Sequence, residues 1–375
     1  MLFRAPSGSY KLERIPKTTK GGLRAWDAAD ELLLNAFFEK YPDKSDKDSR
    51  LLLVNDSFGA LSLALNAYSI DNCSDSFLSH LATRQNIKNN QLEIDIRYIP
   101  STEKLAQTYH YVLIKIPKTL ALLEDQLYRL KANITTETTI IAAAMSKHIH
   151  TSTLKIFEQI IGTTTTSRAT KKARLIYSQN DKVTKNQSPY PITITDKALK
   201  LQLSHHANVF AKNHLDIGTR FFIEQLDQCP QAGQIIDLGC GNGALGIMIQ
   251  RIQKQAHLVF IDESYMAIAS AKYNYQQENK STKASFLLSN CLDQYSGAKV
   301  DLVLCNPPFH QAHSIGDQTA WQMFTQSRDK LIKGGELWVV GNRHLAYHAK
   351  LKRLFGNCRT IAANKKFVVL AATRK

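Results

Sequence analysis

The sequence predicts an α/β protein with two tandem doubly wound parallel sheets. Three observations carry this prediction. Short apolar runs alternate with amphipathic segments of helical length along the whole 375-residue chain. The two halves repeat the same landmarks in the same order. A stretch rich in Asn, Lys, Ser and Pro, residues 178–191, separates them and is expected to be a linker.

The first expected domain, residues 1–177, begins with a polar and basic stretch that precedes an amphipathic helix at 26–38. Apolar runs of strand length follow, and segments with helical spacing lie between them. The expected strands are 51–54, 94–99, 112–116 and 139–143, and the expected helices are 77–88 and 120–131.

The second expected domain, residues 192–375, opens with an alternating segment at 192–203 that is typical of a hairpin. The same alternation of strands and helices follows it. Strands are expected at 235–238, 258–261, 285–288, 301–305 and 336–340, with a closing pair at 359–362 and 367–371, and helices at 244–253, 265–274 and 321–331.

Five landmarks match between the two halves, which favours a duplicated domain. Residues 54–62 match 236–246, and residues 112–117 match 302–307. The other three pairs are 75–86 with 263–274, 148–162 with 343–356, and 171–175 with 365–369.

The duplication is unequal. The first copy has a shortened turn at 56–59 where the second has Gly239, Gly241 and Gly243. It also has residues 116–119 where the second has Asn-Pro-Pro-Phe at 306–309. The first copy is therefore expected to be a degenerate domain that keeps the fold without the chemistry.

The composition points to a polyanionic partner. The formal net charge is +16, the isoelectric point is about 9.5, and basic residues occur in both halves. Nucleic acid is the partner that such an excess most often indicates, with a merely basic protein as the alternative. Six scattered cysteines form no CxxC pair and no zinc-spaced cluster, so free thiols and no metal are expected.

The sequence also predicts a cytoplasmic protein. Free thiols are typical of a reducing compartment. The beginning of the chain has no apolar signal segment, and no run approaches the roughly 18 apolar residues of a membrane span. No membrane association is expected.

Residues 235–246 form the most informative stretch of the chain. An apolar strand is followed by Gly239, Gly241 and Gly243 and then by the start of a helix. Glycines in such a turn let the backbone take positive φ and approach a ligand, and the helix N-terminus behind them has free N–H groups. A cofactor is therefore expected across this turn.

Two kinds of cofactor compete for this turn. Gly241, Gly243 and Gly246 satisfy the dinucleotide fingerprint, which favours a nicotinamide or flavin enzyme. Three features weigh against that interpretation. Asp237 precedes the first glycine, an acidic pair (Asp262 and Glu263) ends the next strand, and Asn306-Pro307-Pro308-Phe309 follows the fourth strand.

Residues 237–243 resemble the S-adenosylmethionine-binding motif of class I (Rossmann-like) methyltransferases. Residues 306–309 resemble the motif of those members that methylate an exocyclic or amide nitrogen. The resemblance implies that Asp262 or Glu263 binds the ribose hydroxyls of S-adenosylmethionine, and that Asn290 and Cys291 border the adenine. Asp237 would orient the loop or meet the ammonium of the cofactor through water.

The Asn-Pro-Pro-Phe turn suits methylation of an exocyclic amine. Such an amine is a poor nucleophile because its lone pair is delocalised. The Asn306 side-chain oxygen and the Pro307 carbonyl can hold its two N–H bonds, and the prolines Pro307 and Pro308 preorganise the turn. Phe309 offers a face on which the base can stack. No tuned general base is needed, because alignment with the activated methyl group supplies most of the rate.

Upstream, Phe210 and Asp216 resemble the lead-in of this enzyme group, where a Phe and an Asp border the cofactor. A simple N-cap role for Asp216 is an equally good interpretation. Ala211-Lys212 stands where Phe-Ser is usual, so no hydroxyl role follows there. His310 and Arg343 could contact RNA, although an ordinary surface position is the commoner explanation for each.

The whole chain resembles the large-subunit ribosomal RNA guanine-N2 methyltransferases of the RlmG type. The resemblance is carried by residues 25–31, 55–61, 112–124 and 342–345 besides the motifs. It implies methylation of guanine N2 in 23S ribosomal RNA, on protein-free RNA and without an obligatory protein partner. The second copy would be catalytic, and the first would bind and position RNA.

Three alternatives stay open at this point. The chain could methylate another planar nitrogen, such as a guanine of 16S ribosomal RNA, a DNA adenine or a protein glutamine. It could be a non-catalytic RNA-binding module, although the intact glycines and Asn306 weigh against that. A dinucleotide oxidoreductase does not account for residues 306–309.

Overall fold

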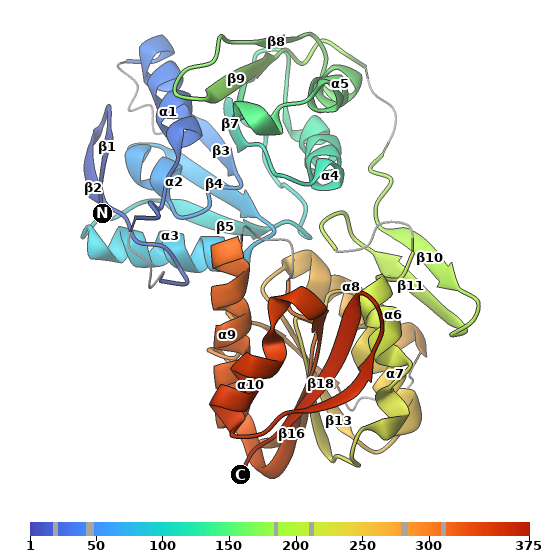
Figure 1. Ribbon diagram of the computed structural model, residues 1–375. Helices are drawn as coiled ribbons and strands as arrows, with labels where there is room; N and C mark the ends of the chain where they lie inside the picture. The colour runs from blue at the N-terminus through green and yellow to red at the C-terminus, as the bar shows by residue number, and fades with distance from the viewer. Residues whose placement is uncertain (18–21, 43–48, 184–186, 210–213, 279–283, 309–312) are drawn as a thin grey trace. The chain divides into compact units, whose positions relative to one another are not determined.

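Each half of the chain folds around its own seven-stranded sheet in the computed structural model (Figure 1). The structure describes residues 1–375 apart from 18–21, 43–48, 184–186, 210–213, 279–283 and 309–312. The chain divides into two compact units, Met1–Tyr190 (the first unit) and Pro191–Lys375 (the second unit).

The first unit alternates strands and helices after a short hairpin. Its strands are β1 (Leu2–Ala5), β2 (Gly8–Lys11), β3 (Arg50–Val54), β4 (Ser69–Ser74), β5 (Ile96–Pro100), β6 (Tyr111–Lys115), β7 (Thr139–Met145), β8 (Thr164–Thr166) and β9 (Ala173–Ser178). Its helices are α1 (Ala28–Lys40), α2 (Ala60–Ala64), α3 (Phe77–Asn89), α4 (Leu120–Leu130) and α5 (Thr151–Ile160), with 3-10 turns η1 (Lys131–Asn133) and η2 (Ser146–His148).

The second unit repeats this order. Its strands are β10 (Ile192–Asp196), β11 (Leu201–His205), β12 (Gln234–Leu238), β13 (His257–Asp262), β14 (Ala284–Leu288), β15 (Val300–Cys305), β16 (Leu331–Asn342), β17 (Arg359–Ala363) and β18 (Phe367–Thr373). Its helices are α6 (Ile217–Ile223), α7 (Ala244–Ile252), α8 (Tyr265–Glu278), α9 (His313–Lys330) and α10 (Tyr347–Phe355), with 3-10 turns η3 (Leu226–Gln228) and η4 (Arg343–Leu345).

The two large sheets have the same topology, which confirms the predicted tandem doubly wound α/β fold. Their strand orders are β5-β4-β3-β6-β7-β9-β8 and β14-β13-β12-β15-β16-β18-β17. The first five strands of each order are parallel, and the last two run antiparallel to their neighbours. Because the parallel strands share one direction, the loops that follow them meet at a single edge, the carboxyl edge of the sheet.

Each sheet is buried on both faces. In the second unit, Ile235 of β12 packs in one apolar layer with Phe260 and Trp338, while its neighbour Ile236 packs in the opposite layer with Phe324. The first unit has two such layers as well. Burial on both faces explains why these strands appear in the sequence as continuous apolar runs.

Strand β4 was missing from the predicted elements because its sequence, Ser-Ile-Asp-Asn-Cys-Ser, is polar. Asp71, in the middle of the strand, is nevertheless buried and paired. Asp71 accepts hydrogen bonds from the Tyr109 hydroxyl at 2.6 Å and from both Arg97 donors at 2.6 and 3.0 Å. A buried polar group that is fully bonded can occupy a central strand at little cost.

Several predicted boundaries were wrong. The helix expected at 321–331 is α9, which begins eight residues earlier at His313, and β16 already begins at Leu331. The expected linker 178–191 includes Ser178, which is the last residue of β9. Near its other end, the Ser188 hydroxyl donates to Asp125 of α4 at 2.5 Å, so this part is held against the first unit.

Strand pairing corrects the alignment of the two copies. Val54 pairs with Cys73 and Ile114, as Leu238 pairs with Ile261 and Cys305. Val54 is therefore the counterpart of Leu238. The turns that follow are equal in length, with Gly59 opposite Gly243, so the predicted shortening is wrong.

The same pairing changes the residue that stands opposite Asn306. Counted from the paired Ile114 and Cys305, the counterpart of Asn306 is Lys115, not Ile116 as the sequence alignment predicted. Asn55 stands opposite Gly239, and Ser74 stands opposite Asp262.

Candidate active site

A glycine loop joins β12 to α7 at the carboxyl edge of the second sheet. Gly239, Gly241 and Gly243 have φ values of +73°, +54° and +82°, a region that glycine enters without steric cost. A Cβ added at Gly243 would lie 3.1 Å from Ala271, so this glycine also allows close packing against α8. Around Gly241 no described atom lies within 4 Å of such a Cβ, which leaves that face of the loop open.

Asp237 lies at the base of this loop, in β12. Its side chain is buried, and Oδ2 accepts a hydrogen bond from the Gly246 N–H of α7 at 2.9 Å. Its Oδ1 is also buried and has no partner among the described residues. Burial raises the pKa of Asp237 to about 7, with a smaller contribution from the nearby charge of Asp262. One oxygen thus orients the loop, and the other is a buried acceptor that no described residue satisfies.

The acidic pair at the end of β13 faces the same loop. Asp262 Oδ2 accepts a hydrogen bond from the Gly241 N–H at 3.0 Å, and Oδ1 accepts one from Ser264 at 3.0 Å. Both Asp262 and Glu263 are half-buried. The carboxylate of Asp262 is therefore bonded directly to the glycine loop.

Asn290 and Cys291 lie in the next turn along the edge, after β14. The Ser289 N–H donates to the Asp262 carbonyl at 3.0 Å, which fixes this turn beside the acidic pair. Asn290 is buried and its side-chain amide donates to Asp293 at 2.5 Å. Cys291 has a φ of +49°, and burial raises the pKa of its thiol to about 12, so the thiol is neutral.

Asn306 follows β15 and is oriented by a chain of two hydrogen bonds. The Thr219 hydroxyl donates to Asp216 Oδ2 at 3.2 Å, so its oxygen is left to accept. Asn306 Nδ2 donates to that oxygen at 2.9 Å. The amide nitrogen therefore faces Thr219, and the amide oxygen points elsewhere.

The Asn306 Oδ1 atom is buried and has no hydrogen-bond partner among the described residues. A buried acceptor in this state is costly unless a ligand satisfies it. The Asn306 carbonyl oxygen would lie 3.9 Å from a Cβ added at Gly239, so the turn and the glycine loop are neighbours. The residue that carries this unsatisfied acceptor therefore adjoins the glycine loop through its main chain.

Of the remaining predicted residues, the structure describes three, and two lie in segments that it does not describe. Pro307 is buried and Pro308 half-buried in the turn after Asn306. Asp216 caps α6 by accepting a hydrogen bond from the Thr219 N–H at 2.8 Å, which confirms the N-cap interpretation. Phe210 and Phe309 lie outside the described residues.

Sequence reasoning missed Thr219. The signal was available, because Thr219 is the third residue after the capping Asp216, the position that meets an N-cap side chain. Its contact with Asn306, 87 residues away in the chain, could not be inferred from that local pattern.

In the first unit, the residues at the positions of Asn306, Asp216 and Thr219 bind one another. The Lys115 amine lies 2.8 Å from both Asp27 and Asp30, which cap and begin α1 as Asp216 and Thr219 do in α6. The Asn55 side chain, opposite Gly239, donates to the Lys115 carbonyl at 2.9 Å. An ion pair therefore replaces the oriented amide, which agrees with a degenerate first copy.

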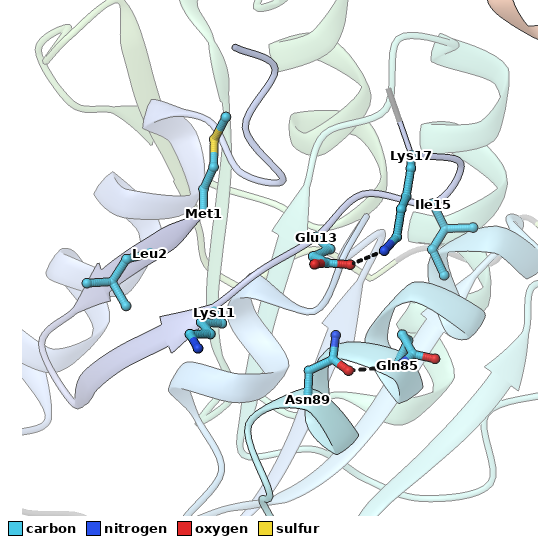
Figure 2. Close-up of a pocket in the computed structure, with 8 residues that line it drawn as sticks. All are labelled: Met1, Leu2, Lys11, Glu13, Ile15, Lys17, Gln85 and Asn89. Atoms are coloured by element: carbon cyan, nitrogen blue, oxygen red, sulfur yellow. Dashed lines mark hydrogen bonds and ion pairs between the residues drawn. The ribbon is translucent and has the colours of Figure 1, made fainter. Parts of the chain in front are cut away.

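A pocket of about 820 Å³ lies elsewhere in the first unit, between the β1–β2 hairpin, the segment that follows it, and α3 (Figure 2). Figure 2 shows its Glu13–Lys17 ion pair, at 2.9 Å, and the Gln85–Asn89 hydrogen bond of α3. Gln85 and Asn89 belong to the last turns of α3, a helix that runs back from the carboxyl edge. This pocket therefore lies away from the edge where α/β sheets bind their ligands.

No group of three or more His, Cys, Asp or Glu side chains among the described residues could hold a metal ion. In the same part of the chain, every helix is too short or too polar to cross a membrane.

Two family models match the chain, one for each unit. The RLMG N-terminal domain matches residues 1–182, and the methyltransferase small domain matches residues 200–371.

Relatives named ribosomal RNA large subunit methyltransferase G match the chain over its full length. The protein from Pseudoalteromonas translucida is 45% identical, over 100% of this chain and 99% of the relative. The protein from Erwinia tasmaniensis is 46% identical, over 97% of this chain and 96% of the relative.

A solved structure also has the same two-unit fold. It is that of the T. thermophilus 16S rRNA N2 G1207 methyltransferase (RsmC) in complex with AdoMet and guanosine. Its TM-score is 0.77 at 19% identity, over 100% of this chain and 98% of that one. Both units therefore have the class I methyltransferase fold, and the chain belongs to the family of ribosomal RNA large subunit methyltransferase G.

Proposed function

We propose that this chain transfers the methyl group of S-adenosylmethionine to the exocyclic N2 of a guanine in 23S ribosomal RNA. The second unit carries out the reaction, and the first unit binds and positions the RNA. The observation that carries the proposal is the side-chain Oδ1 of Asn306, which is buried and has no partner among the described residues, in a turn whose main chain adjoins the glycine loop.

The residues of the second unit fit S-adenosylmethionine. Asp237 has a buried oxygen that no described residue satisfies, which suits the ammonium of the methionine part. Asp262 ends β13 beside the loop, where it can accept hydrogen bonds from ribose hydroxyls. The open face at Gly241 admits the ligand without contact to a Cβ. When bound, S-adenosylmethionine supplies an electrophilic methyl group on a sulfonium.

The chemistry of the acceptor explains the Asn-Pro-Pro turn. The N2 lone pair of guanine is delocalised into the ring, so the amine attacks poorly when free. Asn306 Oδ1 and the Pro307 carbonyl accept its two N–H bonds and direct the lone pair out of the ring plane. Thr219 holds the Asn306 amide in the orientation that this requires. The alignment, rather than a general base, supplies the rate.

The relatives support the choice of substrate. The relatives share a name that refers to the RNA of the large ribosomal subunit, and the long RNA of that subunit is 23S. The solved neighbour is a guanine-N2 methyltransferase of 16S RNA with guanosine bound, which supports N2 as the reacting atom and makes 16S RNA the second candidate. The positive charge of both units suits an RNA substrate in either case.

The test is to incubate the purified protein with methyl-labelled S-adenosylmethionine and protein-free 23S or 16S RNA, and to digest the product to nucleosides. The expected product is labelled N2-methylguanosine from 23S RNA alone. Asn306→Ala should abolish labelling while cofactor binding, measured by calorimetry, remains.

Three outcomes would overturn the proposal. Label in N6-methyladenosine contradicts the acceptor atom, and label in 16S RNA alone contradicts the substrate. Full activity of Asn306→Ala contradicts the mechanism. Because the assay holds only this protein and naked RNA, methylation in it also supports the proposal that no partner protein is required.

A further inference from the structure

We propose that the carboxyl edge of the first sheet binds the phosphates of the substrate RNA through a cationic patch. In the second sheet, the equivalent edge carries the proposed reaction site. The patch consists of the cations Lys118, Lys147, Lys171 and Lys172, with the imidazole of His148 among them, and is called the basic edge. The inference rests on the proposed function, because it names the surface of the first unit that holds the RNA.

The basic edge comes from three segments, which lie after β6, after β7 and directly before β9. Lys118 lies three residues after β6, and Lys147 and His148 lie in η2, directly after β7. Lys171 and Lys172 form the turn between β8 and β9, with φ values of +49° and +63°. The Ser146 N–H donates to the Lys172 carbonyl at 2.7 Å, which ties this turn to η2.

The cations of this edge lie close enough to influence one another. The pKa of His148 is lowered first by burial and then by the charges of Lys147 and Lys118, with Asp27 acting in the opposite direction. Lys171 is paired with Glu31 at 3.1 Å. Within the described part of the chain, the amines of Lys118, Lys147 and Lys172 are exposed and make no ion pair.

Such a group of like charges is unfavourable unless a polyanion neutralises it. Lys115, close by in the sequence, shows how this protein treats a structural cation, because its amine is neutralised by both Asp27 and Asp30. Lys118, Lys147 and Lys172 of the basic edge have no such partner among the described residues, so their amines are available to a ligand.

The second unit retains the same basic edge beside its reaction site. The Arg343 N–H donates to the Lys366 carbonyl at 3.0 Å, the counterpart of the bond from Ser146 to Lys172. Arg343, His344, Lys365 and Lys366 are all exposed.

This second basic edge is connected to the acceptor turn. A Cβ added at Gly218 would lie 3.2 Å from the Phe367 ring, so the turn that contains Lys366 packs on the start of α6. Helix α6 also carries Thr219, which holds Asn306. A phosphate on this edge would therefore lie close to the base that reacts.

Comparison of the two copies separates catalysis from binding. The first copy has replaced Asn306 by Lys115, Asp262 by Ser74 and Gly239 by Asn55. Yet its β8–β9 turn and η2 have kept their cations. A surface retained after the chemistry was lost is one with a use of its own, and cations aligned along a strand edge suit phosphates.

The test compares two triple variants of the full chain. One is Lys118→Ala with Lys147→Ala and Lys172→Ala. The matched control is Lys40→Ala with Lys88→Ala and Lys155→Ala, three exposed lysines on α1, α3 and α5. Both variants lose the same charge, so a difference between them reports the position of the cations.

Binding to 23S RNA is measured by filter retention over a salt series, without methyl transfer. The basic-edge variant should bind about tenfold more weakly, and the slope of log affinity against log salt should shrink by about two to three, which is roughly 0.7 to 0.9 for each lost phosphate contact. The control should keep the wild-type slope. S-adenosylmethionine affinity should be unchanged in both variants.

Equal weakening in the two variants would overturn the inference, and so would wild-type affinity in the basic-edge variant. Weakened binding to polyglutamate with unchanged RNA binding would indicate an acidic protein as the partner instead. If the triple variant unfolds, Lys147→Gln with Lys172→Gln gives the same comparison at two positions. Because these readouts need no turnover, they remain decisive even if the proposed reaction fails.

Discussion

Asn306 and Thr219 are joined by a hydrogen bond of 2.9 Å that decides which way the Asn306 side-chain amide faces. The Thr219 hydroxyl can accept from Asn306 because its own proton is given to Asp216 at 3.2 Å. In the degenerate first unit, Lys115 and Asp30 occupy the same two positions and form an ion pair at 2.8 Å. The contact between these positions has therefore been kept in both copies, with different chemistry.

Replacing Thr219 by Val should lower kcat for methyl transfer by about tenfold, because one net hydrogen bond of roughly 1.4 kcal/mol that orients Asn306 is lost. The affinity for S-adenosylmethionine should hardly change, because Thr219 contacts the amide and not the glycine loop. Thr219→Ser keeps the hydroxyl and should restore the rate. A serine variant as slow as the valine variant would contradict the orienting role.

Gly243 and its counterpart Gly59 allow a matched test of the glycine loop. Both have left-handed φ values, +82° and +85°, and a Cβ at either would lie 3.1 Å from the backbone of the next helix. Each alanine variant should therefore lose about 1–2 kcal/mol of unfolding free energy. Only Gly243→Ala should also weaken S-adenosylmethionine binding in calorimetry. Equal effects of the two variants on that affinity would argue against a cofactor role for the loop.

The sequence predicted the parts of this protein that local chemistry determines. Strand β12, the glycine turn and the start of α7 were predicted because apolar runs and glycines act over a few residues. Strand β4 was not, because its Asp71 is made compatible with burial by Arg97 of β5 and by Tyr109, which precedes β6.

The site shows the same division. The residues of the loop and of the Asn-Pro-Pro turn were predicted from their motifs, and strand pairing brings them to one edge. The orientation of Asn306 depends on Thr219, and the identity of its counterpart Lys115 depends on register. Register is a property of paired strands and cannot be obtained by aligning two diverged copies.

The ion pair of the first unit should be structural. Lys115→Met should lower the free energy of unfolding by about 3–5 kcal/mol, because Asp30 is left buried without its partner. Burial already raises the pKa of Asp30 to about 6, so its protonated carboxyl favours the folded state at low pH, and this stability is lost as the group ionises with pH rising through that value. Without Lys115 the pKa rises further.

The loss in Lys115→Met should therefore be larger at pH 8 than at pH 5, and Asp30→Asn should rescue it in the double variant. Denaturant unfolding at the two pH values measures both effects. S-adenosylmethionine affinity is the control, because the second unit does not contain this pair. A loss that is independent of pH would mean that packing, not charge, is the main contribution of Lys115.

Asp237 should make cofactor binding depend on pH near neutrality. Its pKa of about 7, raised mainly by burial, means that a proton must leave before the carboxylate can meet an ammonium. Affinity for S-adenosylmethionine should thus fall as pH drops below 7, toward a limit of about tenfold per pH unit for one coupled proton.

The stability of the unbound protein should change in the opposite direction and rise as pH drops. A raised folded-state pKa gives stability at low pH that is lost as pH rises through about 7, so Asp237→Asn should gain stability relative to the wild type between pH 5 and pH 8. Calorimetry and denaturant unfolding on both proteins over that window provide the measurement, and a pH-dependent affinity that survives in Asp237→Asn would assign the proton to another group.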